Sequence, residues 1–394
     1  MMGSLNIPNL DRSIATVVED SKIIVTVGSG GVGKTTSAAA LGLYGSHLGK
    51  RTLVITIDPA HRLANALGLR TLSYSPQLLA EEIISQAPFA CPAPVSAMML
   101  DLKAAWDDLI RRASPSSNKT NEILRNPIYG HVSENLPGAQ EFIACETLFT
   151  LHDSGAYDLI ILDTPPTTNA LDFLDSPERI LNMLENDAFN HFFKEEKSLS
   201  QKIGLRFLDF AGTTAQNVLS KFTGMTFLDN LAEFLHLFRD IYPTMSRRTR
   251  QFFDLLKSPS AQFLVITSPA PAPLSEANFF LDELRARKHP VGAVVCNRMH
   301  FMPRKSWRTD IPKLLPSTQE GTSPVSQNLQ DIASRLCQDQ EDRADADLQA
   351  ITPLFERLQN DIPMVCIPRM SVDVHDIQSL GHLVPWLVGD EGLF

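Results

Sequence analysis

Residues 22–36 read KIIVTVGSGGVGKTT, and this stretch predicts the fold of the chain. Its first six residues are rich in β-branched side chains and are typical of a buried strand. A glycine-rich turn follows at 28–33, and the alanine-rich residues after it favour a helix over about 35–47. A second apolar run at 51–57 ends in Asp58. Strand, glycine loop, helix and strand form a βαβ unit, which implies a parallel sheet.

The same alternation continues along the chain. Further strands are expected at 157–162, 263–267, 292–296 and 364–367, and helices at 139–153, 274–288, 328–359 and from about 374. We expect short helices at the rim of the sheet within 70–135, and a loop over 303–325, where Pro, Ser and Thr cluster. The alternation predicts an α/β fold, namely a P-loop NTPase with a mostly parallel, doubly wound sheet flanked by helices.

Residues 186–256 do not follow this alternation of strands and helices, because they contain no strand pattern. They hold about half of the chain's 21 phenylalanines, and their apolar side chains recur at helical spacing. We interpret this stretch as an α-helical insertion subdomain. It would interrupt a P-loop ATPase domain made of residues 20–185 and 257–394.

The composition excludes several classes of protein. The 394 residues carry a formal net charge of -10 and form no basic run, so neither nucleic acid nor an anionic membrane is an expected partner. No window approaches the roughly 18 apolar residues of a spanning helix, and the C-terminal GHLVPWLVGDEGLF contains Pro385, so we expect no stable membrane insertion. The five cysteines form no CxxC pair, which argues against a thiolate zinc site. Without a secretion signal pattern, we expect a cytoplasmic protein.

The glycine loop has the composition of a phosphate site. Residues 28–35 fit G-x-x-x-x-G-K-[ST], a pattern whose glycines let backbone N–H groups surround phosphates, and the following helix adds the positive end of its dipole. We expect Lys34 to reach the β- and γ-phosphates of ATP, acting in catalysis, and the Thr35 hydroxyl to bind Mg²⁺. The expected nucleotide-binding residues of this loop are Gly28, Ser29, Gly30, Gly31, Val32, Gly33, Lys34, Thr35 and Thr36.

Three polar residues end strands of the predicted sheet. Asp163 follows the strand at 157–162 and fits the Walker-B position, which holds Mg²⁺ or its water. Asp58 could orient and deprotonate an attacking water, and Asn297 could read the edge of adenine. Ligands bind at the carboxyl ends of parallel strands, so all three are expected at one crevice. A turn-capping role for either aspartate is the alternative.

These motifs, in this order, resemble the ArsA-type ATPases, which include arsenite-pump ATPases and the ATPases that target tail-anchored membrane proteins. The resemblance is strongest to the bacterial type labelled anion-transporting ATPases. The matching stretches are VGSGGVGKTT at 27–36, IDPAHRLANALG at 57–68, LPGAQE at 136–141, LDTPPTTNALDFL at 162–174, VVCNRM at 294–299 and IPRMSVDVHDIQSL at 367–380.

The resemblance implies roles for single residues and for the assembly. Asp58 corresponds to the water-activating aspartate, Asp163 to the Walker-B aspartate, and Asn297 to an adenine-recognising asparagine. Pro368 falls on a loop that packs on the adenine. Members of the family bind ATP or ADP as dimers or as fused double units, so a chain with one P-loop implies a homodimer.

The chain departs from the family pattern within the loop itself. Ser29 stands where the family usually has a lysine that reaches the partner's nucleotide, and a hydroxyl cannot supply that positive charge. Either Arg62 substitutes for the lysine or activation across the dimer is weak. The arsenite-binding cysteine set of the pump ATPases is not recognisable, because Cys145 alone would not hold a soft ligand.

The leading hypothesis is a dimeric ATPase that binds and hydrolyses Mg-ATP and whose nucleotide state switches the helical subdomain. That subdomain would bind a partner or a hydrophobic client, including a membrane-protein segment. The aromatic residues that would line a client groove, or else form a closed core, are Phe189, Phe192, Phe193, Phe207, Phe210, Phe234 and Phe238. The alternatives are a nucleotide-gated interaction module with little hydrolysis, and the ATPase subunit of an anion efflux system.

Overall fold

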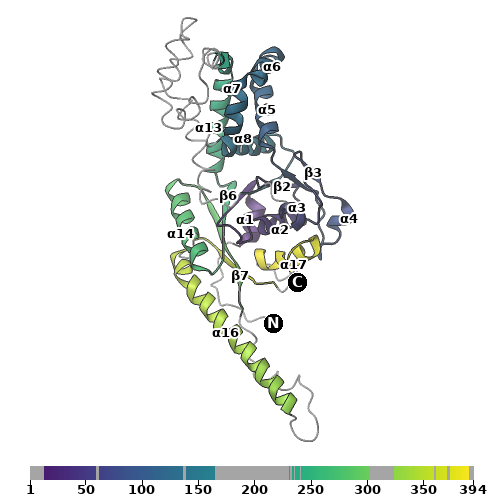
Figure 1. The fold of residues 1–394 in the computed structure, drawn as a ribbon, viewed down its shortest axis with the longest axis vertical. Helices are drawn as coiled ribbons and strands as arrows, with labels where there is room; N and C mark the ends of the chain where they lie inside the picture. The colour runs from purple at the N-terminus through teal and green to yellow at the C-terminus, as the bar shows by residue number, and fades with distance from the viewer. Residues whose placement is uncertain are drawn as a thin grey trace. The chain divides into compact units, whose positions relative to one another are not determined.

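The structure, a computed structural model, describes two compact units of the chain (Figure 1). The first, here called the sheet unit, consists of Met1–Met98, Tyr157–Thr168 and Pro259–Phe394, and the second, the helical unit, consists of Met99–Ala156 and Asn169–Ser258. Within them the described residues are 13–58, 62–135, 139–164, 230, 233–234, 236–239, 241–301, 324–358, 361–370 and 373–389.

The sheet unit is built on an eight-stranded sheet with the order β3-β4-β2-β5-β1-β6-β7-β8. The strands are β1 (Ile23–Val27), β2 (Thr52–Thr56), β3 (Gln77–Leu78), β4 (Val95–Met99), β5 (Leu159–Asp163), β6 (Ala261–Thr267), β7 (Val291–Met299) and β8 (Met364–Pro368). β1 pairs in parallel with β5 and β6, and β7 with β6 and β8, whereas β3 is antiparallel to β4. The predicted α/β fold with a mostly parallel, doubly wound sheet is confirmed.

Strand β1 lies at the centre of the sheet, and all five of its residues are buried. Parallel pairing brings the carboxyl ends of its neighbours to the same edge: Asp163 of β5 is the register partner of Thr26 on β1 and of Thr56 on β2. A continuous β-branched run is typical of a strand covered on both faces. The register therefore places the glycine loop beside Asp163.

Helices cover both faces of this sheet. One core joins α1 (Ile14–Asp20), α2 (Lys34–His47), α3 (Arg62–Ala66) and α17 (Ile377–Val388) with the strands. α14 (Pro271–Ala286) packs on β6, β7 and α16 (Pro324–Leu358). Figure 1 shows α14 and α16 on the other side of β6 and β7 from α1 and α2. Within the described residues, no helix is long and apolar enough to cross a membrane.

The structure differs from the expected elements in two places, and a third expectation is untested. Residues 70–99 contain the short strands β3 and β4 and the one-turn helix α4 (Glu81–Ile84), where we expected only short helices. The helix expected over 274–288 begins earlier, since α14 starts at Pro271 with proline in its first turn, where the missing N–H costs nothing. The loop expected over 303–325 lies almost wholly outside the described residues.

The helical unit has a core of its own. Its described helices are α5 (Leu102–Ala113), α6 (Ser117–Arg125), α7 (Pro127–Asn135), α8 (Ala139–Asp153) and α13 (Tyr242–Leu256). The core includes Trp106, Ile110, Phe142, Phe234 and Met245. Thus α5 to α7 pack with α8 and α13 in this core. The predicted subdomain boundary at 186–256 stays a prediction, since most of that range is not described.

A buried ion pair joins two helices of this unit. Glu146 on α8 is 3% exposed, and its Oε1 accepts a hydrogen bond from Arg248 Nε on α13 at 2.6 Å. Burial raises the pKa of the Glu146 carboxyl, while the Arg248 charge acts in the opposite direction. The pair fixes the register between the two helices, because either charge left alone in the interior would be costly.

Candidate functional site

The glycine loop occupies the turn between β1 and α2, and two of its glycines have no room for a side chain. Gly28 has φ +150°, and a Cβ there would lie 2.0 Å from the carbonyl oxygen of Ile266. Gly33, the N-cap of α2, has φ +100°, and its Cβ would lie 2.3 Å from Asn297 Nδ2. Positive φ and close packing both require glycine here. The loop is therefore held tightly between β6 and the end of β7.

Lys34 is the first residue of α2, and its side chain folds back over the loop. Its Nζ donates to the carbonyl oxygens of Gly28 and Ser29, each at 2.8 Å, and the residue is only 6% exposed. Burial lowers the pKa of the ammonium, and the charge of Asp163 opposes this effect. A buried cation that donates to two carbonyls among the described residues is well suited to exchange them for phosphate oxygens.

Thr35 and Asp163 meet at the same place. The Thr35 hydroxyl donates to Asp163 Oδ2 at 2.7 Å, and Asp163 is 1% exposed. The other carboxylate oxygen, Oδ1, is buried and has no hydrogen-bond partner within the described part of the chain. A hydroxyl and an unsatisfied carboxylate side by side fit Mg²⁺, which keeps several water ligands and takes few from the protein. These two residues would hold the ion.

Asp58 is linked to this pair through Thr56. The Thr56 hydroxyl donates to Asp163 Oδ2 at 3.1 Å and accepts from the backbone N–H of Asp58 at 3.2 Å. The Asp58 carboxylate forms an ion pair with Arg62 Nη1 at 3.5 Å, and their side chains are 14% and 57% exposed. Asp58 is thus held close to Asp163, and its side chain remains partly exposed to water.

The side chain of Asn297 contacts the glycine loop directly. Its Nδ2 donates to the carbonyl oxygen of Val32 at 2.8 Å, and its Oδ1 accepts from the backbone N–H of Arg298 at 2.8 Å. Arg298 has φ +63°, a conformation that turns the chain sharply after Asn297. The amide retains one N–H that neither of these contacts uses.

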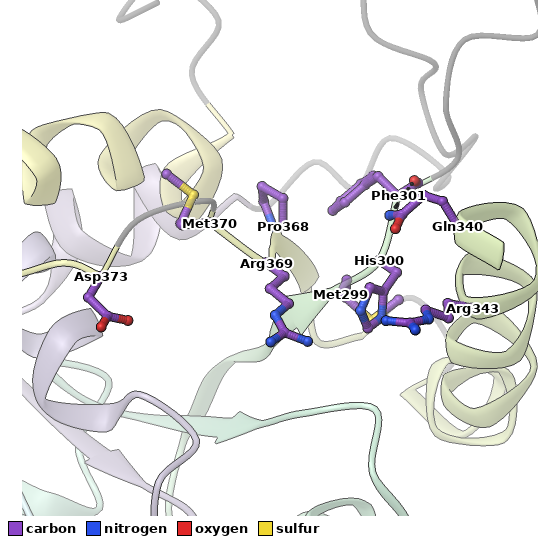
Figure 2. A pocket seen from close by; sticks show the side chains of 9 residues that line it. All are labelled: Met299, His300, Phe301, Gln340, Arg343, Pro368, Arg369, Met370 and Asp373. Atoms are coloured by element: carbon purple, nitrogen blue, oxygen red, sulfur yellow. Dashed lines mark hydrogen bonds between the residues drawn. The ribbon is translucent and has the colours of Figure 1, made fainter. Parts of the chain in front are cut away.

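Pro368 lies at the end of β8, as register partner of Met299 on β7. It lines a pocket at the ends of these two strands together with His300 and Arg369 (Figure 2). The structure therefore brings Thr35 and Asp163 together by a direct hydrogen bond, and Lys34 and Asn297 each contact the glycine loop. Pro368 is two strands beyond β6 in the sheet order.

Thr56 is a residue of the site that local sequence patterns did not indicate, whereas Ser29 was among the expected nucleotide-binding residues of the loop. Thr56 contacts both aspartates, and only the register of β2 against β5 identifies it. Ser29 is 8% exposed, and its buried Oγ has no hydrogen-bond partner among the described residues. A buried hydroxyl without a partner costs free energy, so it is available to a ligand's oxygen.

The charge state of Asp163 should make stability depend on pH in the absence of nucleotide and Mg²⁺. Burial raises the pKa of Asp163 to about 6, against the hydrogen bonds from Thr35 and Thr56. The folded chain then keeps this proton at pH values where the unfolded chain has lost it. The free energy of unfolding should therefore fall by up to about 3 kcal/mol as the pH rises from 4 to 6. Urea unfolding of the wild type and of Asp163→Asn measures this difference.

The variant should lack that fall, and it should also lose the stabilisation by Mg²⁺, which needs the charged carboxylate and should grow as the pH rises through 6. Asp345→Asn, an exposed carboxylate on α16, is the control and should follow the wild type. Parallel wild-type and Asp163→Asn profiles would contradict the assignment of this proton.

Comparison with known proteins places this geometry in a family. The family described as anion-transporting ATPase matches residues 21–308. The chain is similar to "ATPase ASNA1 homolog" of Entamoeba dispar, at 26% identity over 304 residues, covering 75% of this chain and 81% of the relative. It is similar to "ATPase get3" of Aspergillus terreus, at 25% identity over 295 residues, covering 74% and 78%.

A shorter similarity is to a protein of Prosthecochloris vibrioformis whose name describes an arsenical pump-driving ATPase. It is 30% identical over 164 residues, covering 40% of this chain and 36% of the relative. The family match spans more than half of the 394 residues and includes the glycine loop, both aspartates and Asn297. The chain therefore belongs to the anion-transporting ATPase family, the ArsA ATPases.

Proposed function

We propose that the protein binds Mg-ATP at Gly28–Thr36 and hydrolyses it. The observation that carries the proposal is the contact of Thr35 Oγ1 with Asp163 Oδ2 at 2.7 Å, beside a carboxylate oxygen that lacks a partner in the described residues. In the bound state, Mg²⁺ would neutralise charge on the β- and γ-phosphates. Lys34 would leave the carbonyls of Gly28 and Ser29 for phosphate oxygens.

Asp58 would act on the attacking water. A carboxylate within reach of the γ-phosphate orients the water and accepts its proton as the bond to phosphorus forms. The ion pair with Arg62 at 3.5 Å positions this carboxylate. Arg62, whose side chain is 57% exposed, is the cation that we propose stands in for the lysine absent at Ser29.

The experiment that tests the proposal is phosphate release from ATP with and without Mg²⁺. Wild type should release phosphate in Mg²⁺ and lose nearly all activity in EDTA. Thr35→Ala should need a higher Mg²⁺ concentration for half-maximal rate, since it removes one ligand of the ion. Release that is independent of Mg²⁺ would contradict the assignment of Thr35 and Asp163.

We further propose that the protein works as a homodimer in the cytoplasm and that its nucleotide state switches the helical unit, which binds a partner or a hydrophobic client. Of the seven phenylalanines proposed for a client groove, five lie outside the described residues. Phe234 and Phe238 pack together in the core of the helical unit, with ring centroids 5.4 Å apart. Light scattering of Asp58→Asn in ATP and in ADP tests the dimer, and a monomer in both states would contradict it.

A second candidate is the ATPase subunit of an anion efflux system, which the name of the Prosthecochloris vibrioformis relative favours. It predicts that arsenite or an oxyanion stimulates phosphate release. A flat response to both would remove this candidate and leave the client-binding switch.

Asn297 gives a prediction that separates two roles. One N–H of the Asn297 amide donates a hydrogen bond to Val32 O, and we propose that the other N–H donates to the adenine ring. Asn297→Asp removes both donors, so Mg-ATP affinity should fall by about 100-fold and Mg-tripolyphosphate affinity by about tenfold, at roughly one hydrogen bond per factor of ten. Isothermal titration with both ligands measures the gap. Equal losses would mean that Asn297 acts only by positioning the loop.

A further inference from the structure

Three sulfur-containing side chains meet where β7 and β8 run side by side in the sheet unit. Cys296 of β7 is the register partner of Cys366 on β8, and neighbouring strands lie about 4.8 Å apart. The Sγ atom of Cys296 is 3.4 Å from the thioether sulfur of Met299. All three residues are buried, and Cys366 is the most exposed of them at 8%. The pairing of the two strands therefore brings two thiols and a thioether to one place.

The two thiols point to the same face of the sheet. Successive side chains of a strand alternate between its faces, and the adjacent residues Val295 and Ile367 belong to the core shared with α2 and α17. Cys296 and Cys366 therefore point to the opposite face, on the side of α14 and α16 (Figure 1). Burial raises the pKa of the Cys296 thiol, and the Cys366 thiol and the Asp347 carboxylate on α16 act in the same direction. This agrees with the two thiols lying close together.

The types of ligand narrow the choice of metal ion. Within the described residues, no group of three or more histidine, cysteine or carboxylate side chains could hold a metal ion, so the third ligand here is a thioether. Zinc usually takes four ligands from thiolate, imidazole and carboxylate groups. Thiolate and thioether sulfurs are soft ligands, which favour Cu⁺. The cluster therefore fits a soft cation better than zinc.

The balance of charge favours a cation with a single charge. Burial raises the pKa of the Cys366 thiol to about 12, so the thiols are protonated in the free protein at neutral pH. A metal ion binds the thiolate, so an S–H bond breaks, a metal–sulfur bond forms and the proton leaves to water. A monovalent cation that displaces one proton leaves the net charge of the site unchanged. This avoids the cost of an unpaired charge in the protein interior.

Met299 provides a path to the buried thiols. It lines a pocket of about 640 Å³ at the carboxyl ends of β7 and β8 (Figure 2). Pro368 lines the same pocket, and Asn297 directly precedes the turn that leads to Met299, so the pocket borders the residues that we assign to adenine. Cys296 and Cys366 are not among the lining residues. A soft ion that enters the pocket would meet the thioether first and the thiols behind it.

We propose that Cys296, Cys366 and Met299 form a binding site for a soft monovalent metal ion, with Cu⁺ as the expected ligand. The pairing of β7 and β8 creates this site, because the two cysteines lie on different strands. The proposal goes beyond the proposed ATPase and does not depend on it.

The test measures Cu⁺ binding to the full chain in the absence of nucleotide. The background chain carries Cys91→Ser and Cys337→Ser, because these two partly exposed thiols could bind the ion by themselves. Competition with a colorimetric Cu⁺ chelator under anaerobic, reducing conditions gives the stoichiometry and the affinity. Titration with Ag⁺ repeats the measurement with a soft monovalent ion that stays in one oxidation state. The expected result is a single ion per chain.

Substitution of the ligands should weaken this binding, whereas a matched buried thiol should not matter. Loss of a group that only hydrogen-bonds to a metal ligand typically lowers metal affinity by about 10- to 100-fold. Loss of a ligand should cost more, so Cys296→Ser and Cys366→Ser should each weaken Cu⁺ binding by at least about 100-fold. Met299→Leu nearly keeps the side-chain volume and should weaken it by at least about tenfold. Cys145→Ser removes a buried thiol of the helical unit and should change it by less than about twofold.

Unfolding curves of the metal-free variants show whether each of them folds, and Met299→Leu, as the most conservative change, keeps the test valid if a cysteine variant does not. Cu⁺ should raise the unfolding midpoint of the background chain but not that of Cys296→Ser. A background chain that binds no Cu⁺ would overturn the proposal. Equal affinity in the background chain and in either cysteine variant would also overturn it, and so would an unchanged affinity in Met299→Leu.

Discussion

Replacement of Lys34 by methionine should weaken Mg-ATP binding by more than about 100-fold. Methionine keeps most of the side-chain volume but removes the ammonium that now donates to Gly28 O and Ser29 O. In the proposed function that charge contacts the β- and γ-phosphates, and charge-assisted hydrogen bonds in a buried site are among the strongest polar contacts. Isothermal titration with Mg-ATP, supported by an unfolding curve of the free protein, measures the loss.

Lys50 provides a matched control in the same unit. It is also partly buried, its Nζ donates to the carbonyl oxygens of Val18 at 2.8 Å and Ser21 at 3.1 Å, and burial lowers its pKa. Lys50→Met should lower stability and leave Mg-ATP affinity within about threefold. If Lys34→Met and Lys50→Met lose Mg-ATP affinity equally, the loss in Lys34→Met comes from a less stable sheet unit and not from a lost phosphate contact.

Replacement of Asp58 by asparagine should lower the turnover number by about 100-fold or more and leave ATP affinity nearly unchanged. Asparagine keeps the shape and the backbone contact to Thr56, but it cannot accept a proton from water. General-base catalysis typically contributes factors of about 10²–10⁴. Steady-state phosphate release gives the turnover number, and titration of the same variant gives the affinity.

The control for Asp58 is a second aspartate that pairs with an arginine in the sheet unit. Asp158 precedes β5, at the opposite end of this strand from Asp163, and contacts Arg51 Nη2 at 2.8 Å. Asp158→Asn removes a comparable surface ion pair without touching the site and should leave turnover within about twofold. Equal loss in both variants would show that removing a carboxylate disturbs the unit as a whole.

Much of the sheet could be predicted from local patterns. β1, β2 and β5 are short runs of branched aliphatic residues that are followed by a glycine loop or an aspartate. The sequence therefore predicted both the strands and the polar residues at their carboxyl ends. β4 was not, because Val95–Met99 reads VSAMM, follows Pro92 and Pro94, and has little β-branched character. Its strand conformation comes from its position beside β2 in the sheet, and tertiary context overrides weak propensity.

The candidate site also contains both residues that local patterns predicted and contacts that they did not. Lys34, Thr35 and Asp163 were predictable together because a P-loop signature and a parallel strand end require them to meet. The contact between Asn297 and Val32 joins residues 265 positions apart, and no local pattern reveals it. The role of Thr56 depends on the register of β2 against β5. The grouping of α5 to α8 with α13 depends on apolar faces that the sequence alone could equally have placed on the sheet.

The most direct test of the account is single-turnover hydrolysis of ATP with the protein in excess over nucleotide and with Mg²⁺ present. Under these conditions each ATP molecule is bound, so the rate reports chemistry rather than affinity. Wild type should cleave the bound ATP at least about 100-fold faster than Asp58→Asn, while both proteins retain the nucleotide. Equal rates would contradict hydrolysis through Asp58 and leave a nucleotide-gated binding module.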